Sequence, residues 1–447
     1  MYSKYFRTFL IIGLLSIAAA AQESDAPLAT MSGQSFTVAD LPADVAKAWR
    51  ELPSTLVIAR KDLLELQIDN MLLLQEANKR SIDVDALLDI EVTKRVKDPD
   101  EKTVKALYDE NKASIGDTPL AEIRPQIVNY LRMEPEKKAR EDFSRKLRTS
   151  GKIEYGKNVN DEGLSLNDVI ATVNGEPITF AMYKRKNALP LYEYEANVFD
   201  QLDSSLRMIV DAAVYQVESQ SLEIPVNQLI AREITSKMKD FTADEQNRLE
   251  KTLKNKLYSK YRVKYFVTEP EPYVQEISVD DDPSFGAASP KATVVVFADF
   301  ECPACAGVHP ILKQLLKKYG SQVRLVYRDF PLTKIHENAL PAARAAYAAS
   351  KQGKFFEFGE LLYDNQTELD SASLEKYAKQ LGLDLQKFNA DRNSEEALAE
   401  IKKDLADGNE YGVTGTPSIF VNGYKIRTLS VQAFEQAIER AIIGVYN

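Results

Sequence analysis

The C-terminal half of the chain alternates short apolar runs with amphipathic stretches. Valine-rich runs of about seven residues are typical of buried strands, and apolar residues at three- and four-residue spacing are typical of helices. The predicted order is strand, helix, strand, helical region, turn-rich hairpin and helix, which indicates a mixed α/β domain with a helical insertion. In chain order these segments are 293–299, 302–319, 323–327, roughly 336–410, 415–423 and a last helix ending near Ile443.

Long, charged helices with apolar stripes dominate the N-terminal half. Each of its two helical regions opens with a short strand, a turn and a second strand, and the turn contains Gly33 in one region and Asn174-Gly175 in the other. The pattern predicts two mainly helical modules. Apolar residues at helical spacing are Leu63, Leu64, Leu66, Ile68, Met71, Leu72 and Leu74 on one helix and Leu249, Leu253 and Leu257 on a later one.

The two helical regions are copies of one another. Residues 29–37 (ATMSGQSFT) recur as 171–179 (ATVNGEPIT), an offset of 142 positions (171 − 29). Agreement in one register over two separate stretches indicates duplication of a whole module. The further pairs at the same offset are Asp69 and Asp211, Glu76 and Glu218, Ile82 and Ile224, and Val84 and Val226.

The first residues predict export. Lys4 and Arg7 precede an apolar stretch, 9–21, that ends in four alanines before Gln22. This is the pattern of a secretory signal peptide, and the stretch is short for a membrane span. An uncleaved N-terminal anchor is the alternative. No cysteine directly follows the apolar stretch, which excludes a lipoprotein anchor. From the signal peptide we expect a periplasmic protein rather than one secreted to the medium.

Length and charge limit the remaining function classes. The 447 residues exceed one ordinary domain and predict two to four. The formal net charge is −10, and it becomes about −12 once Lys4 and Arg7 are removed with the signal peptide (−10 − 2). An acidic exported protein is a poor candidate for nucleic-acid binding.

The chain contains two cysteines, and they form a Cys-x-x-Cys pair, Cys302-Pro303-Ala304-Cys305, directly after a predicted strand. At such a junction the first sulfur lies at a helix N-terminus, where unpaired N–H groups and the helix dipole favour the thiolate. Pro303 suits the first helical turn. One such pair and no other cysteine indicates redox chemistry rather than a disulfide framework.

Segment 168–266, and more weakly 27–155, resembles the N-terminal helical region of SurA-type periplasmic chaperones. The resemblance depends on the hairpin 174–179 (NGEPIT) and on the helical patterning. It implies that the modules hold unfolded polypeptide. Parvulin domains of that family use paired histidines, and the two histidines here, His309 and His336, both lie in the C-terminal half, so prolyl isomerase chemistry is not implied. A dimerisation or spacer role for these helices is the alternative.

Residues 274–447 resemble the DsbA-like exported thiol oxidoreductases, which have a thioredoxin fold with a helical insertion. The resemblance implies that Cys302 is the exposed nucleophile, that Cys305 resolves the mixed disulfide and that Pro417 is a cis-proline opposite the dithiol. Thr416, Pro303 and Ala304 are then expected to contact substrate, and no cofactor beyond the redox-active disulfide is implied. The matching motifs are 297–305 (FADFECPAC), 328–332 (RDFPL), the histidine-alanine pattern 336–346 and 412–417 (GVTGTP).

Two positions depart from the family pattern. Relatives often carry a buried acid six residues before the nucleophile, where this chain has Val296, so Asp299, Glu301 or a water would have to assist Cys305. Ala304 replaces a histidine found in the most oxidising relatives, which implies a less oxidising disulfide.

The two histidines have ordinary structural explanations. His309, one turn after Cys305, is expected to be a satisfied structural histidine, with tuning of the thiols as the alternative. His336 is expected to cap or pack the inserted helices. A zinc site built from Cys302, Cys305 and His309 would lack a fourth ligand.

The sequence thus predicts an α+β multidomain chain. Its expected activity is forming or isomerising disulfides in cell-envelope proteins, with the helical modules holding unfolded substrate. Expected partners are unfolded or cysteine-containing exported proteins and an unidentified redox-recycling partner, which could lie in the membrane. A chaperone whose thioredoxin-like domain is mainly structural is the alternative, and electron direction and oligomeric state stay open. The predicted segments are a signal peptide (1–21), two helical modules (22–160 and 165–267), a linker (268–290) and the DsbA-like domain (274–447).

Overall fold

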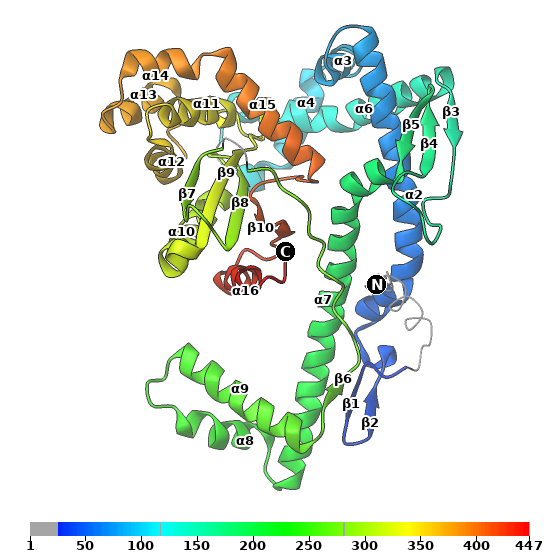
Figure 1. The fold of residues 1–447 in the computed structure, drawn as a ribbon, viewed down its shortest axis with the longest axis vertical. Coiled ribbons are helices and arrows are strands. Elements are labelled where there is room, and N and C mark those ends of the chain that lie inside the picture. The colour runs from blue at the N-terminus through cyan, green and yellow to red at the C-terminus, as the bar shows by residue number, and fades with distance from the viewer. Residues whose placement is uncertain (1–25, 117, 280–281, 447) are drawn as a thin grey trace, which may run out of the picture. The chain divides into compact units, whose positions relative to one another are not determined.

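The computed structural model describes residues 26–116, 118–279 and 282–446 (Figure 1). The predicted signal peptide, 1–21, lies outside these ranges. Within them, no helix is both long enough and apolar enough to cross a membrane. The described chain divides into two compact units, and these do not follow the ranges 22–160 and 165–267. One unit is Val57–Asn187, and the other combines the segment up to Leu56 with everything from Ala188 onward.

The duplicated elements have matching backbones. In both copies the hairpin turn has two residues with positive φ, at 49° and 89° for Ser32 and Gly33 and at 51° and 90° for Asn174 and Gly175. This conformation matches the right-handed twist of the strands and favours Asn-Gly. The corresponding elements are β1 (Ala29–Met31) and β4 (Val169–Val173), β2 (Gln34–Phe36) and β5 (Glu176–Thr179), α2 (Ala43–Lys79) and α7 (Phe180–Ser221), and α3 (Val84–Glu91) and α8 (Val226–Glu233).

The two copies exchange their hairpins. The first hairpin, β1 and β2, is completed by β6 (Lys264–Tyr265) from the end of the second copy. The second hairpin, β4 and β5, is completed by β3 (Ile153–Tyr155) from the end of the first copy. The cores follow the same exchange. One joins Trp49 to Leu202 and Leu257, and the other joins Ile68 and Leu147 to Ile170 and Ile178.

The described residues of the N-terminal half form four further helices, and four short 3₁₀ turns occur along the described chain, the last of them in the C-terminal half. The helices are α4 (Glu101–Glu110), α5 (Lys112–Ile115), α6 (Leu120–Ser150) and α9 (Ala243–Lys260). The 3₁₀ turns are η1 (Val38–Asp40), η2 (Thr93–Arg95), η3 (Thr235–Lys237) and η4 (Gly320–Gln322).

The C-terminal half contains a five-stranded sheet in the order β11-β10-β8-β9-β7 (Figure 1). Its central strands, β8 (Ala292–Ala298) and β9 (Val323–Asp329), are parallel and are connected by α10 (Pro303–Tyr319). The antiparallel strands are β7 (Ser284–Gly286), β10 (Ser418–Val421) and β11 (Tyr424–Lys425). The inserted helices are α11 (Ala339–Ser350), α12 (Phe355–Asp364), α13 (Ser371–Gln380), α14 (Leu385–Arg392) and α15 (Glu395–Glu410), and α16 (Val431–Ile442) is the last helix.

The predicted order of elements in this half is confirmed, with one correction. The segment 284–286, which lies within the predicted linker 268–290, is the edge strand β7, which pairs with β9. The valine run of β8 is continuous because the sheet is covered on both faces. Val294 and Val296 pack in the core that includes α10 and α16, whereas Val295 and Phe297 pack against Leu189 of α7.

A buried arginine ties the sheet to the inserted helices. Arg328 of β9 is fully buried and lies 2.6 Å from carboxylate oxygens of both Asp404 and Asp407 on α15. The neighbouring carboxyl, Asp329, is also buried, and its Oδ1 has no hydrogen-bond partner among the described residues. Burial, together with the charges of Asp404 and Asp282, raises the pKa of Asp329 well above its usual range. Asp329 therefore keeps its proton at neutral pH.

We expect Asp329→Asn to stabilise the protein at neutral pH and not in acid. The unfolded chain loses the Asp329 proton near pH 4, while the folded chain retains it, so rising pH destabilises the wild type by up to about 1.4 kcal/mol per pH unit until the folded pKa is reached. Melting temperatures at pH 4, 5.5 and 7 measure this. Asp62→Asn, at an exposed position on α2, is the matched control. A difference between Asp329→Asn and wild type that does not vary with pH would contradict the account.

Candidate active site at the dithiol

The dithiol lies where β8 passes into α10. Cys302 is the N-cap residue of α10, with extended backbone angles, and Pro303 occupies the first turn. The Cys302 carbonyl accepts hydrogen bonds from the backbone N–H groups of Cys305 (3.1 Å) and Ala306 (3.2 Å). A proline here removes an N–H that would lack an intrahelical acceptor in any case. The predicted position of both cysteines relative to the helix is therefore found in the structure.

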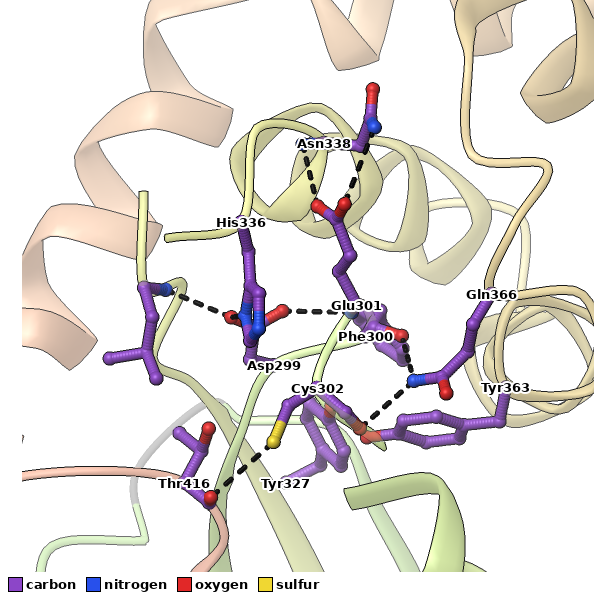
Figure 2. A network of polar contacts seen from close by, with 11 residues as sticks. Asp299, Phe300, Glu301, Cys302, Tyr327, His336, Asn338, Tyr363, Gln366 and Thr416 are labelled. Carbon is purple, nitrogen blue, oxygen red and sulfur yellow. Dashed lines mark hydrogen bonds and ion pairs between the residues drawn. The ribbon is translucent and has the colours of Figure 1, made fainter. Parts of the chain in front are cut away.

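Both cysteines are free thiols and both are buried, with exposed fractions of 6% for Cys302 and 1% for Cys305. The expectation that Cys302 is exposed is therefore wrong. Its Sγ lies 3.4 Å from the carbonyl oxygen of Thr416, to which it donates a hydrogen bond (Figure 2). The Thr416–Pro417 peptide bond is cis, as the family pattern implied. The structure thus brings Cys302 together with the adjacent pair Thr416 and Pro417, which lies more than a hundred positions later in the sequence.

The surface beside Cys302 is formed by the two residues between the cysteines. Pro303 and Ala304 are both exposed, whereas Cys302 and Cys305 are not. A partner that approaches the first sulfur therefore meets these two side chains.

Asp299 organises the loop before the dithiol. Its carboxylate is buried, and Oδ1 accepts the backbone N–H of Glu301 at 2.8 Å. Oδ2 accepts the backbone N–H of Leu332 at 2.9 Å and lies 2.7 Å from Nδ1 of His336 (Figure 2). The Asp299 carbonyl accepts the backbone N–H of Cys302 at 3.1 Å. One residue thus connects the end of β8, the segment after β9 and the first turn of α10.

Of the two roles expected for His336, capping an inserted helix is not found. The N-cap residue of α11 is Asn338, not His336, and the imidazole of His336 is bonded to Asp299. The sequence offered no signal for this pair, because 37 positions separate the two residues.

Two further side chains fix the loop from the inserted helices. Glu301 Oε2 accepts the backbone N–H of Asn338 at 2.6 Å. The amide Nε2 of Gln366 donates to the carbonyl oxygens of Phe300 and Cys302, at 2.9 Å each (Figure 2). Gln366 was not among the predicted site residues, since an isolated glutamine carries no pattern that would indicate such a contact.

Cys305 has an apolar and aromatic environment. Phe300 stacks on Tyr327, with ring centroids 5.1 Å apart. The hydroxyl of Tyr327 lies 2.6 Å from that of Tyr363. Burial is the main cause that raises the pKa of the Cys305 thiol well above its ordinary value. Cys305 is therefore protonated at neutral pH and needs a proton acceptor before it can attack a disulfide.

His309 is not the satisfied histidine that the sequence suggested. Its Nε2 is buried and has no hydrogen-bond partner among the described residues. The ring packs on Tyr363, with centroids 5.0 Å apart.

One cluster of carboxylates has the spacing of a metal-binding site. Within the described ranges, the group of His, Cys, Asp or Glu side chains with metal-compatible spacing is Asp282, Glu400 and Asp404, whose ligand atoms lie within 4.8 Å of one another. Arg328 lies in the same cluster and pairs with Asp282 at 3.2 Å and with Asp404. A fixed guanidinium already supplies positive charge there, so this cluster is an internal ion-pair network.

A family model described as Thioredoxin matches residues 278–440. Among curated proteins, the chain is 41% identical over 160 residues to Na(+)/H(+) antiporter NhaA 3 of Salinispora tropica, covering 34% of this chain and 24% of that protein. It is 36% identical over 169 residues to Na(+)/H(+) antiporter NhaA 1 of Salinispora arenicola, covering 38% and 26%. The chain thus spans about a quarter of the length of these relatives.

Three solved structures are also similar to part of the chain. A thioredoxin-like oxidoreductase from Silicibacter pomeroyi is 30% identical with a TM-score of 0.34, and covers 36% of this chain and 91% of its own. BdbD from Bacillus subtilis is 21% identical with a TM-score of 0.36, covering 39% and 100%. The thiol-disulfide exchange protein alpha-DsbA2 from Wolbachia pipientis is 22% identical with a TM-score of 0.32, covering 36% and 86%.

The family match and the sheet together identify a thioredoxin-like domain in the C-terminal half. The helical character of the N-terminal half is also confirmed. The resemblance of that half to SurA-type chaperones stays a prediction.

Replacing Asp299 should lower the free energy of unfolding by more than the loss of a small side chain normally does. Asp299→Ala leaves two backbone N–H groups and the His336 ring without their acceptor, and we expect a loss of roughly 2–5 kcal/mol in the free energy of unfolding. Asp299→Asn retains an acceptor oxygen and should lose less. Urea denaturation measures both, with Glu337→Ala at an exposed neighbouring position as the control. A loss below about 1 kcal/mol for Asp299→Ala would show that the loop does not depend on this carboxylate.

Proposed function

We propose that this protein is an exported thiol-disulfide oxidoreductase that acts on cysteines of cell-envelope proteins through Cys302 and Cys305. The observation that carries the proposal is the placement of the two cysteines of the chain. They lie at the N-terminal end of α10 in a thioredoxin-like domain, with the first sulfur against the carbonyl before a cis-proline. The N-terminal sequence pattern supports export to the periplasm.

The reaction needs no cofactor beyond the cysteine pair. In the oxidising direction, a substrate thiolate attacks Cys302 Sγ, the Cys302–Cys305 bond breaks, and Cys305 leaves and takes a proton. A second substrate thiolate then attacks the mixed disulfide, which yields a substrate disulfide and the reduced dithiol. A redox partner that accepts two electrons and two protons restores the Cys302–Cys305 disulfide. Isomerisation uses the same attack by Cys302 on an existing disulfide, and the reduction potential of the pair decides between the two uses.

Three residues are proposed to contact substrate. Pro303 and Ala304 are exposed beside Cys302, and the Thr416 carbonyl already accepts a hydrogen bond from Cys302 Sγ. An extended substrate strand that pairs with the backbone of Thr416 would place its cysteine next to that sulfur.

The helical half is proposed to hold unfolded substrate near the dithiol. Large apolar side chains are exposed on its helices, among them Ile58, Leu66, Met133 and Met208, and Phe241 is exposed just before α9; each is at least half exposed. Weak, adaptable apolar contacts of this kind suit unfolded chains, and holding one raises its effective concentration at Cys302. A chaperone in which the thioredoxin-like domain is mainly structural is the second candidate, supported by the same exposed side chains.

Cysteine variants test the redox proposal. Cys302→Ser should abolish activity on reduced insulin or on a protein with scrambled disulfides. Cys305→Ser should instead accumulate a mixed disulfide between Cys302 and substrate, because the resolving thiol is missing. Non-reducing electrophoresis followed by mass spectrometry identifies the adduct. Equal activity of wild type and Cys302→Ser would refute the proposal.

The substrate-holding proposal has a separate test in the full chain. The double variant Cys302→Ser/Cys305→Ser should suppress aggregation of a chemically unfolded protein as well as the wild type does, because binding does not involve the thiols. Light scattering during dilution from denaturant measures this. If the double variant holds substrate and the wild type shows no thiol exchange with any protein, the chaperone candidate is favoured. If neither suppresses aggregation, the helical half does not hold unfolded chain.

A further inference from the structure

A small cavity lies directly beside the buried thiol. It has a volume of about 30 Å³ and is bounded mostly by apolar side chains of β8, β9, α10 and α12. Four of its lining residues can exchange protons: Cys305, His309, Tyr327 and Tyr363. The cavity is large enough to hold one water molecule. The cavity therefore joins the least accessible sulfur of the site to an imidazole and to a pair of hydroxyl groups.

His309 is placed to reach both this cavity and solvent. It follows Cys305 by four positions on α10, so their Cβ atoms are neighbours on one helix face, about 5–6 Å apart. Its Nε2 is buried and lacks a hydrogen-bond partner in the described part of the chain. The residue as a whole is only half-buried. One side of the ring is thus inside the protein while the other can exchange protons with water.

The other candidates for this role are already occupied. Both carboxylate oxygens of Asp299 accept hydrogen bonds from backbone N–H groups, and one also binds His336. The Glu301 carboxylate is bonded to Asn338. Val296, which also lines the cavity, has no titratable group.

We propose that His309 takes the proton from Cys305 when Cys305 resolves a mixed disulfide, and returns it when the reaction runs in reverse. The Cys305 proton passes to Nε2 of His309, directly or through one water in the cavity. The electron pair of the Cys305 sulfur then forms the bond to Cys302 Sγ. The bond between Cys302 and the substrate sulfur breaks, and the substrate leaves as a thiolate with that bond's electrons.

The charges around His309 are compatible with this role. Burial is the largest effect and lowers the pKa of His309, and Lys313 on α10 acts in the same direction. Glu360 and Asp364 on α12 oppose this, and Glu360 is itself paired with Lys313 at 2.7 Å. His309 is therefore mainly neutral at pH 7, and the tautomer that carries its proton on Nδ1 has a lone pair on Nε2.

The tyrosine pair cannot be the final acceptor. Burial raises the pKa of both Tyr327 and Tyr363 well above the ordinary value. Their hydroxyls stay protonated and can only pass a proton along or donate a hydrogen bond to the thiolate.

The test separates the two chemical steps with a small probe. Reduced full-length protein is mixed with oxidised glutathione, quenched with acid at intervals and analysed by mass spectrometry. Formation of the glutathione adduct reports attack by Cys302, and its loss reports attack by Cys305. We expect His309→Gln to leave the first rate within about twofold and to slow the second about tenfold or more at pH 7, with a smaller deficit at pH 9, where hydroxide replaces the missing base.

Two variants sharpen the result. Lys317→Gln, at an exposed position on the same helix, is the matched control and should change neither rate. His309→Ala, which enlarges the cavity, should regain part of its second-step rate when imidazole is added. An equal slowing of both steps at every pH, or no slowing of the second step, would overturn the proposal.

The wild type provides a test that does not depend on folding of a variant. The chain has two histidines, so NMR can follow the titration of each. The second-step rate of the wild type should fall in acid with the pKa that NMR assigns to His309, and a rate that follows only the thiol titration would refute the inference. This inference rests on the proposed function in one respect: Cys302 must be able to form a mixed disulfide. Activity on glutathione without activity on any protein would count against the proposed function and leave the His309 result standing.

Discussion

The buried carboxylate of Asp299 is the constraint on which the geometry of the dithiol depends. A charged group enclosed at the end of β8 must be surrounded by donors, because an unpaired buried charge is strongly destabilising. The donors available are the N–H groups of Glu301 and Leu332 and the ring of His336. Satisfying one carboxylate therefore fixes the loop into α10, the chain after β9 and the start of the inserted helices at the same time.

The two sulfurs have opposite environments as a consequence. Cys302 lies at the helix N-terminus, facing the Thr416 carbonyl and beside the exposed Pro303 and Ala304. Cys305, one turn further, faces the aromatic layer of Phe300 and Tyr327. The first sulfur is next to exposed side chains, whereas the second is enclosed by apolar and aromatic side chains. Such a division suits a pair in which one thiol exchanges with substrate and the other reacts only with its neighbour.

Local pattern predicted the parts of this structure that local forces determine. The strand β8 was evident because both of its faces are buried, which leaves an uninterrupted valine run. The start of α10 was evident because a proline follows Cys302. The edge strand β7 was missed because its three residues are all exposed and only pairing with β9 makes them a strand.

Contacts between residues that are distant in sequence could not be predicted from local pattern. The hydrogen-bond partner of Cys302, Thr416, lies 114 positions later, and the partner of His336 lies 37 positions earlier. The sequence placed His309 one turn from Cys305. It could not predict that Nε2 of His309 is buried without a hydrogen-bond partner among the described residues, because residues of α12, more than forty positions later, line the same cavity.

The exchanged hairpins show why the helical half is not a string of separable modules. Each three-stranded sheet takes a hairpin from one copy and its last strand from the other, and each core does the same. Removing either copy would therefore leave both sheets incomplete and would expose apolar residues of both cores. Removing the whole helical half would also uncover Phe297 and Phe420, which pack with Leu189 and Tyr192 of α7 on the second face of the sheet. The sequence shows the duplication as two copies. Each core contains residues of both copies, so neither copy is stable without the other. Function in this half is therefore best assigned by substitutions in the intact chain.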